Sequence, residues 1–224
     1  MDKKFRAERD SLGEYPVPLD VWYGIQTARA VANFPISGRR PDQDFIIAHA
    51  RVKRAAASAN MAAGWLDARL GQAVVAAADA IIGGGHHDQF VVDRFQAGAG
   101  TSHNMNSNEV IANLANVALG GHKGDYRPVH PNDHVNMGQS TNDTIPTAIR
   151  LAALAKLPRL LAAVEDMAAA FSALGAREAA TVKKFQKKDN LIHLIPMNHD
   201  YETMEYMPNR VSILGKVVEV RRWL

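Results

Sequence analysis

Residues 138–150 read GQSTNDTIPTAIR, and residues 98–109 read GAGTSHNMNSNE. Each stretch places glycine, hydroxyl and amide residues directly before a segment with the apolar spacing of a helix. The start of a helix exposes backbone N–H groups that lack an intrahelical acceptor, and it carries positive partial charge, so it attracts anions. Two such starts in one chain predict a site for a ligand with two carboxylates.

Apolar spacing outside these stretches predicts a mainly α-helical protein. The opening residues, to about Arg40, are expected to form an extended arm with a short helix. The expected helices cover about residues 25–32, 44–63, 70–82, 104–119 and 146–174. In the second helix, with Asp44 as N-cap, a helical rhythm is given by Ile46, Ile47, Ala50, Val52, Ala55 and Ala56. In the fourth helix the residues expected to point inward are Val110, Ile111, Leu114 and Val117.

The hydrophobic period changes near Ala176 from about 3.6 to about 2 residues. Residues 180–188, 190–196 and 211–223 alternate or run apolar over short stretches, and Lys188-Asp189-Asn190 is typical of a turn. This pattern predicts a short antiparallel β segment attached to a helical protein. Such a change of class without a linker is unusual.

Composition excludes several functions. The chain has 47% hydrophobic residues, no cysteine and a formal net charge of +3. Disulfides, thiolate metal sites and a cysteine nucleophile are therefore excluded, and the charge gives no indication of nucleic-acid binding. Neither a secretory leader nor an apolar run that could span a membrane is visible, so we expect a cytoplasmic protein without membrane partners.

Four side chains of the two stretches suit one kind of chemistry. Removing a proton from the carbon beside a carboxylate builds up negative charge on that carboxylate, which needs several hydrogen-bond donors. Thr101, Ser140, Thr141 and Asn142 supply hydroxyl and amide donors. The alternative is that these residues only cap their helices.

Longer segments around these residues resemble a known family. QAGAGTSHNMNSNEVIANLA at 96–115 and VHPNDHVNMGQSTNDTIPTAIRLA at 129–152 are similar to the first two signature regions of the aspartase and class II fumarase family, and residues 8–37 are similar to the same family. The resemblance covers about residues 1–177. Within it, residues 139–143 and 132–134 resemble aspartate ammonia-lyases more than fumarases.

The resemblance implies a carbon-nitrogen lyase that reversibly eliminates ammonia from L-aspartate to give fumarate, with fumarate hydratase as the alternative. It implies no cofactor, a small dicarboxylate substrate and a homotetramer. Residues 1–140 would form the N-terminal domain, and residues 141–177 the first helix of a central bundle.

Roles of single residues also follow from the resemblance. It assigns Thr101, Ser140 and Thr141 to the substrate carboxylate, and Asn142 to the region of the leaving group. A secondary anion site would comprise His130, Asn132 and Asp133. Ligand chemistry leaves a metal site at His130, Asp133 and His134 as an alternative, but we expect no metal.

The family's later signatures, a Thr-His pair and a Gly-Ser-Ser loop followed by Lys and Asn, are not found in the 224 residues. The serine of that loop is the proton-abstracting base in the family. No catalytic base is therefore assigned here, and we expect the chain alone to lack lyase activity.

Residues 178–202 and 211–224 resemble the C-terminal end of LexA-type repressors, which are self-cleaving serine-lysine proteases. The resemblance puts Lys183 in the place of the lysine that deprotonates the serine, although that family's serine lies upstream of the matching segment. Two alternatives to a lyase fragment therefore remain open: a fragment of such a repressor, and an inert fusion product. Whether a fusion is natural, engineered or an artefact stays open as well.

Overall fold

The computed structural model describes residues 4–96, 98–177, 183–196 and 200–210. The chain divides into two compact units, Met1–Leu160 and Leu161–Leu224. The division into 1–140, 141–177 and 178–224 expected from the sequence remains a prediction. Among the described residues, no helix combines the length and the apolar character needed to cross a membrane.

The first unit opens with a β-hairpin where the sequence predicted an extended arm. Strands β1 (Phe5–Asp10) and β2 (Gly13–Pro18) are antiparallel, with Phe5 opposite Pro18 and Asp10 opposite Gly13. Gly13 has a φ of +107°, which favours glycine, and the Asp10 side chain accepts a hydrogen bond from the Leu12 N–H at 2.9 Å. The sequence analysis did not predict that these extended segments pair, because charges and prolines hide the alternation of the two strands.

Four helices follow the hairpin: α1 (Ile25–Asn33), α2 (Gln43–Ala62), α3 (Ala68–Ile82) and α4 (Thr101–Ala118). The mainly helical fold predicted from the sequence is confirmed. Two starts differ from the prediction, since α2 is capped by Asp42 rather than Asp44, and α4 begins at Thr101 rather than Asn104. Short helical turns at His87–Gln89 (η1) and Pro131–Val135 (η2) interrupt the loops.

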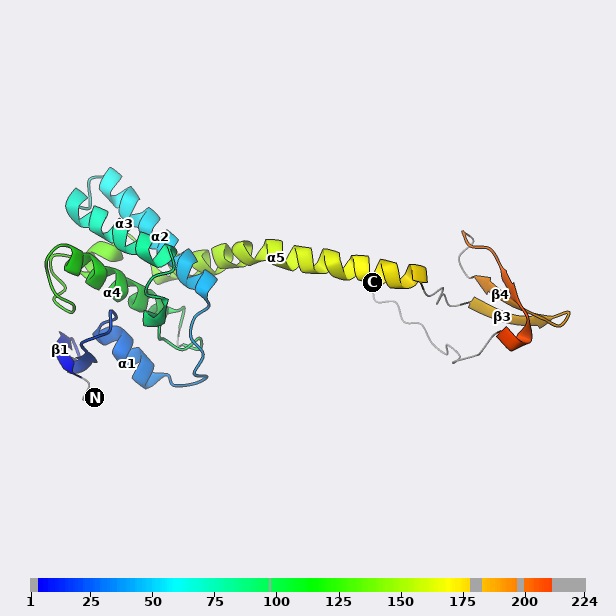
Figure 1. Cartoon of the computed structure of the whole chain (residues 1–224). Helices are drawn as coiled ribbons and strands as arrows, with labels where there is room; N and C mark the ends of the chain where they lie inside the picture. The colour runs from blue at the N-terminus through cyan, green and yellow to red at the C-terminus, as the bar shows by residue number, and fades with distance from the viewer. Residues whose placement is uncertain (1–3, 97, 178–182, 197–199, 211–224) are drawn as a thin grey trace. The chain divides into compact units, whose positions relative to one another are not determined.

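Helix α4 is the centre of the first unit and packs against α1, α3 and η2 (Figure 1). Val110 and Ile111 are buried as predicted, but Val117 is 41% exposed and does not point inward. Polar side chains occupy much of the buried surface instead. They are Asn104, Asn106, Ser107, Asn108, Glu109, Asn113 and Asn116.

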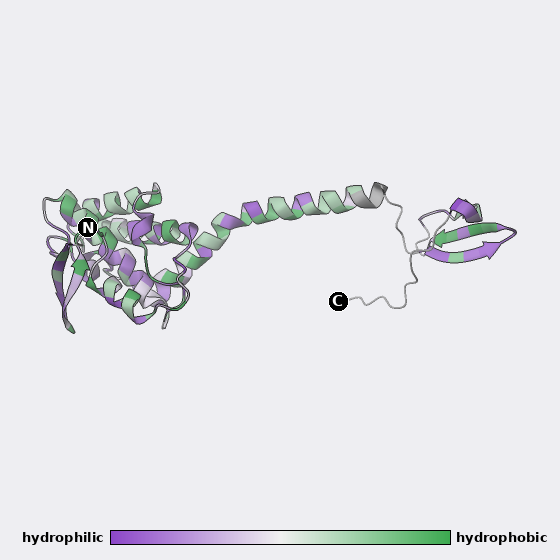
Figure 2. Ribbon diagram, turned by 60° about the horizontal axis from the view of Figure 1, so that its bottom comes forward, coloured by the Kyte–Doolittle hydropathy of each residue, from purple (hydrophilic) through white to green (hydrophobic). Residues whose placement is uncertain are grey.

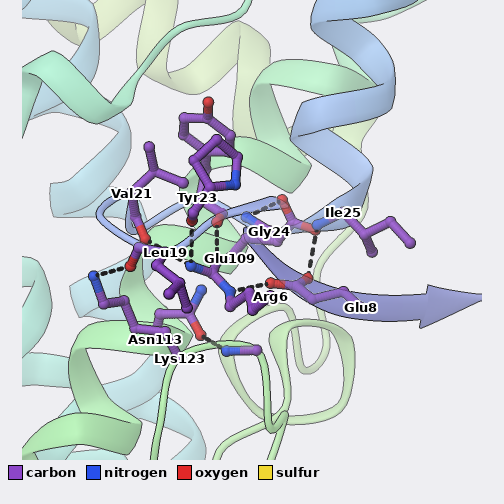
Figure 3. A network of polar contacts seen from close by, with 12 residues as sticks. Arg6, Glu8, Leu19, Val21, Tyr23, Gly24, Ile25, Glu109, Asn113 and Lys123 are labelled. Atoms are coloured by element: carbon purple, nitrogen blue, oxygen red, sulfur yellow. Dashed lines mark hydrogen bonds and ion pairs between the residues drawn. The ribbon is translucent and has the colours of Figure 1, made fainter. Parts of the chain in front are cut away.

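Glu109 of α4 takes the place of a cap at the start of α1, whose own N-cap residue, Gly24, offers no side chain (Figure 3). Its carboxylate accepts hydrogen bonds from the N–H groups of Gly24, Gln26 and Thr27 and from the Thr27 hydroxyl, at 2.6 to 3.0 Å. Glu8 of β1 accepts the Ile25 N–H at 2.8 Å. Two carboxylates therefore join β1, α1 and α4 at the positive end of α1.

Replacing Glu109 by Leu should lower the free energy of unfolding by about 3 kcal/mol, because the buried N–H groups of Gly24 and Thr27 would lose their acceptor. Burial, opposed by the hydrogen bonds from Thr27 and Gln26, raises the pKa of Glu109 to about 7. The stability that Glu109 contributes is therefore largest at low pH and declines as the pH rises to about 7, so urea unfolding at pH 5, followed by circular dichroism, measures the difference. The exposed Glu14 provides the matched control, and equal effects of Glu14→Leu and Glu109→Leu would contradict the capping role.

The long helix α5 (Thr141–Arg177) begins in the first unit, where Ala148 and Ala152 are buried together with Ala48 of α2. It contains Pro146 and Pro158. Hydrophobic residues continue along the helix (Figure 2). A stripe of large apolar side chains on this helix is exposed in the described part of the chain, with exposed fractions from 41% to 67% for Ile149, Leu154, Leu157, Leu161, Val164, Met167 and Phe171.

The second unit contains the predicted antiparallel sheet, in the order β3 (Lys183–Lys188), β4 (Leu191–Pro196) and β5 (Met204–Tyr206). The predicted turn joins β3 to β4, and Asp189 and Asn190 both have positive φ, as in a two-residue hairpin turn. A 3-10 turn, η3, covers Pro208–Arg210. The expected strand at 211–223 lies outside the described residues.

Candidate anion-binding site

The starts of α4 and α5 lie side by side in the first unit, as the two sequence stretches required. Asn104 Nδ2, in the first turn of α4, donates a hydrogen bond to Thr141 Oγ1 at the start of α5, at 3.2 Å. One residue before α4, a Cβ added to Gly100 would lie only 3.0 Å from Ile145 Cγ2. Two helix N-termini, each with positive partial charge, therefore meet at one place.

The four predicted donors take different roles at this place. Ser140 caps α5, because its Oγ accepts the Asn142 N–H at 3.2 Å, which leaves its own O–H free to donate. Thr101 and Asn142 are exposed, and α4 has no side-chain cap at Gly100. Thr141 alone of the four has a recorded contact that joins the two helices. That all four converge on one ligand stays a prediction.

A cavity of about 590 Å³ opens beside the start of α4, but the four donors do not line it. Its wall is largely apolar, which does not suit a dicarboxylate. The lining residues are Pro41, Asp42, Phe45, Arg94, Gln96, Gly98, Ala99, Gly100, His103, Ile145, Pro146 and Ile149. This cavity therefore does not contain the four predicted donors, although residues from the starts of both helices line it.

Lys53 of α2 is fully buried near the two helix starts, and the apolar and polar patterns of the sequence do not by themselves point to it. Its Nζ donates to Asn104 Oδ1 at 2.7 Å, Asn136 Oδ1 at 2.9 Å and Gln139 Oε1 at 3.0 Å. An ammonium group has three N–H donors, so these three amide oxygens satisfy it completely. The signal was present in the sequence, since Lys53 lies at helical spacing on the buried face with Ile46, Ala50 and Ala57.

Burial lowers the pKa of Lys53 to about 7. The acceptors are neutral amides, and no carboxylate among the described residues forms an ion pair with this ammonium group. Its helix neighbour His49 is also fully buried, bonded through Nδ1 to Ser107 Oγ at 2.8 Å, and burial holds the pKa of His49 well below its usual value. Lys53 is thus a buried cation that titrates near neutral pH.

Replacing Lys53 by Met should make the free energy of unfolding less dependent on pH between about 7 and 10.5. The folded-state pKa of Lys53 lies below its unfolded value, so unfolding takes up a proton in this window and the wild-type protein gains stability as the pH rises. The difference between wild type and variant should increase by up to about 1.4 kcal/mol per pH unit. Denaturant titrations over this pH range measure it.

Lys4→Met is the control for this comparison, because Lys4 is exposed in the same unit. Ionisable groups that are present in both the wild type and a variant contribute equally to the two free energies of unfolding, so their contributions cancel in the difference. If Lys53→Met and Lys4→Met had the same pH profile, Lys53 would not be a buried titrating cation.

The predicted secondary anion residues lie in the loop around η2. His130 Nδ1 accepts the N–H groups of Asn132 and Asp133, both at 3.2 Å, so its Nε2 is the ring nitrogen left to donate. His130 and Asn132 line a second cavity of about 260 Å³, and Asp133 does not. Arg9, Asp10, Ser11, Ile25, Gln26, Met105, Glu109, Tyr126 and Pro131 complete its wall.

Lys183, at the start of β3, is half-buried, and its Nζ donates to Met204 Sδ at 3.0 Å. No serine occurs in residues 183–196 or 200–210, the described part of the chain beyond α5. Within the described residues, no three His, Asp or Glu side chains gather in an arrangement that holds a metal ion.

Comparison with known proteins places the chain among lyases. Residues 13–184 match the family model described as Lyase. The aspartate ammonia-lyase of Bacillus subtilis is 54% identical over 169 residues, which are 75% of this chain and 36% of that relative. The class II fumarate hydratase of Halobacterium salinarum is 52% identical over 179 residues, 76% of this chain and 38% of that relative.

A solved structure agrees with these matches. The fumarate lyase:delta crystallin of Brucella melitensis bound to cobalt has a TM-score of 0.76 and 49% identity, over 83% of this chain and 41% of that chain. The chain belongs to the family of aspartate ammonia-lyases and class II fumarases, which confirms the family predicted from residues 96–115 and 129–152. It spans less than half the length of these relatives.

A second family model, described as Peptidase S24-like, matches residues 165–218. The segment for which the sequence predicted a resemblance to self-cleaving repressors is therefore similar to that family. The two family models overlap at residues 165–184.

Proposed function

We propose that the first unit carries the carboxylate-binding part of an aspartate ammonia-lyase site. The adjacent starts of α4 and α5, joined by the Asn104–Thr141 hydrogen bond, support the proposal most directly. A dicarboxylate such as L-aspartate or fumarate would place one carboxylate at these two positive helix ends. Fumarate hydratase remains the alternative, since a relative of that name is nearly as similar as the aspartate ammonia-lyases.

The residue roles in this proposal follow the chemistry of the donors. The hydroxyl groups of Thr101, Ser140 and Thr141 donate to the carboxylate on which negative charge develops, and the Asn142 amide lies toward the leaving group. His130 and Asn132, with Asp133 beside them, are assigned to the secondary anion site; Arg9 adds a positive charge to the same cavity, and Asp10 and Glu109 add carboxylates. These groups stabilise charge, so the proposal assigns none of them as the proton-abstracting base.

Succinate, which cannot react, should bind to the first unit and shift the amide NMR signals of Thr101, Ser140 and Thr141. Thr141→Val should weaken binding about tenfold, because one charge-assisted hydrogen bond is lost. Thr147→Val is the matched control: Thr147 is an exposed residue of the same helix whose hydroxyl donates to Asp143 O at 2.6 Å. Isothermal titration calorimetry measures the two affinities.

Equal binding by Thr141→Val and Thr147→Val would place the anion site elsewhere. The absence of any saturable shift with succinate would refute the proposed function. Because the 224-residue polypeptide spans 36% of the Bacillus subtilis relative, we expect it to bind without releasing ammonia from L-aspartate. Clear turnover in a coupled ammonia assay would show that its own residues supply a base.

We also propose that the chain associates with copies of itself through α5, and that a homotetramer is the full assembly. The exposed stripe of large apolar side chains on this helix favours burial against like helices.

Light scattering should find the wild-type chain larger than a monomer. Leu157→Glu combined with Leu161→Glu should shift it toward monomer, because two charges would enter the interface. Arg159 lies between these leucines on the opposite side of the helix, so Arg159→Glu should leave the assembly unchanged. A monodisperse wild-type monomer would contradict the proposal.

A second candidate concerns the other unit alone. The Peptidase S24-like match over residues 165–218 supports a chimeric chain in which a LexA-like segment follows the lyase segment. If Lys183 acted as a base there, self-cleavage at alkaline pH would depend on it, and Lys183→Ala would abolish that cleavage. If the wild-type chain stayed intact after alkaline incubation, the proposal of self-cleavage would be wrong.

A further inference from the structure

We infer that Lys53 is a positioning residue of the carboxylate site: through Asn104 it orients the Thr141 hydroxyl toward the ligand and supplies the buried positive charge that favours binding of a dicarboxylate. The inference rests on the proposed function and adds a group that touches neither ligand nor solvent.

The geometry forms a continuous path of hydrogen bonds from the charge to the site. Lys53 Nζ donates to Asn104 Oδ1 at 2.7 Å, which fixes the orientation of the amide. The Nδ2 of the same amide then donates to Thr141 Oγ1 at 3.2 Å. Since the hydroxyl oxygen accepts from Asn104, its own proton points away from the amide and is available to an incoming carboxylate.

The same ammonium group fixes the loop that leads into α5. Its other two hydrogen bonds go to Asn136 Oδ1 and Gln139 Oε1, directly before the cap residue Ser140. Gln139 Nε2 donates to Val135 O at 2.8 Å, so the loop is held from both sides. A single side chain of α2 thus sets where α5 begins relative to α4.

The charge of Lys53 is not cancelled by the groups that face it in the described structure. Asn104 from α4 and Asn136 and Gln139 from the loop are neutral amides that do not titrate. On α2 itself the ionisable neighbour is His49, which burial keeps neutral. In a poorly hydrated interior an unpaired cation acts on an anion over a longer distance than it does in water.

A consequence follows from linkage between the two sites. If protonated Lys53 favours binding of a dianion, binding of the dianion must favour protonated Lys53 by the same factor. Without a ligand, the pKa of Lys53 is about 7. A change in this pKa on ligand binding is therefore easily measured near neutral pH. A lysine with only a structural role would titrate identically with and without ligand.

The experiment uses the wild-type chain labelled with 13Cε-lysine, with the Lys53 signal assigned by its absence in Lys53→Met. NMR spectra are recorded from pH 5 to 10 in three conditions: no ligand, saturating succinate, and the uncharged diamide succinamide. Succinate should move the Lys53 midpoint upward by about one pH unit, which corresponds to about tenfold tighter binding by the protonated form. Succinamide should leave the midpoint unchanged.

Calorimetry provides the second readout, in which wild-type affinity for succinate should fall about tenfold between pH 6 and pH 9. Saturable succinate binding with an unmoved Lys53 midpoint would overturn this inference and leave the proposed function standing. No saturable binding at any pH would overturn both. An equal upward shift with succinamide would show that ligand size rather than charge acts on Lys53, and would also overturn the inference.

Discussion

Burial of the polar side of α4 is the constraint on which the rest of the first unit depends. Buried amide groups need partners, and here many of the partners are the backbones of loops. Asn113 donates to Trp22 O and accepts from Gly124 N, while Asn116 both donates to and accepts from the backbone of Val129. The asparagines of one helix therefore fix loops that are far apart in the sequence, including the loop that leads to His130.

The same constraint explains how two opposite charges are buried without a direct ion pair. Glu109 is surrounded by the N–H groups at the start of α1, and Lys53 by amide oxygens, so each charge meets dipoles fixed by the fold. Fixed dipoles need no reorganisation when a charge appears nearby. The carboxylate site proposed for this chain would benefit from this arrangement, because its donors would already be oriented before a ligand arrived.

The sequence predicted the helices, the turn at Asp189-Asn190 and the proximity of the two glycine-rich stretches, because these depend on local spacing and on motifs that span tens of residues. It did not predict the packing face of α2, where Lys53 is buried and Ala55 is exposed. The apolar periodicity of a helix does not indicate that a lysine is buried. The burial of Lys53 is possible only because α4 and the loop before α5 supply hydrogen-bond acceptors for its ammonium group. For the same reason the apolar pattern predicts an inward Val117 and does not predict the buried asparagines of α4.

Different interactions stabilise helix α5 at its start and farther along the chain. Its start is held by tertiary contacts, namely Thr141 with Asn104, Ala148 and Ala152 with Ala48, and Lys156 with Asp42 at 2.8 Å. Farther along, the sequence is rich in alanine and leucine, which favour a helix without any partner, and both family models match residues 165–177 of it. Local propensity thus suffices to continue the helix, but it leaves the apolar side chains from Leu154 to Phe171 exposed.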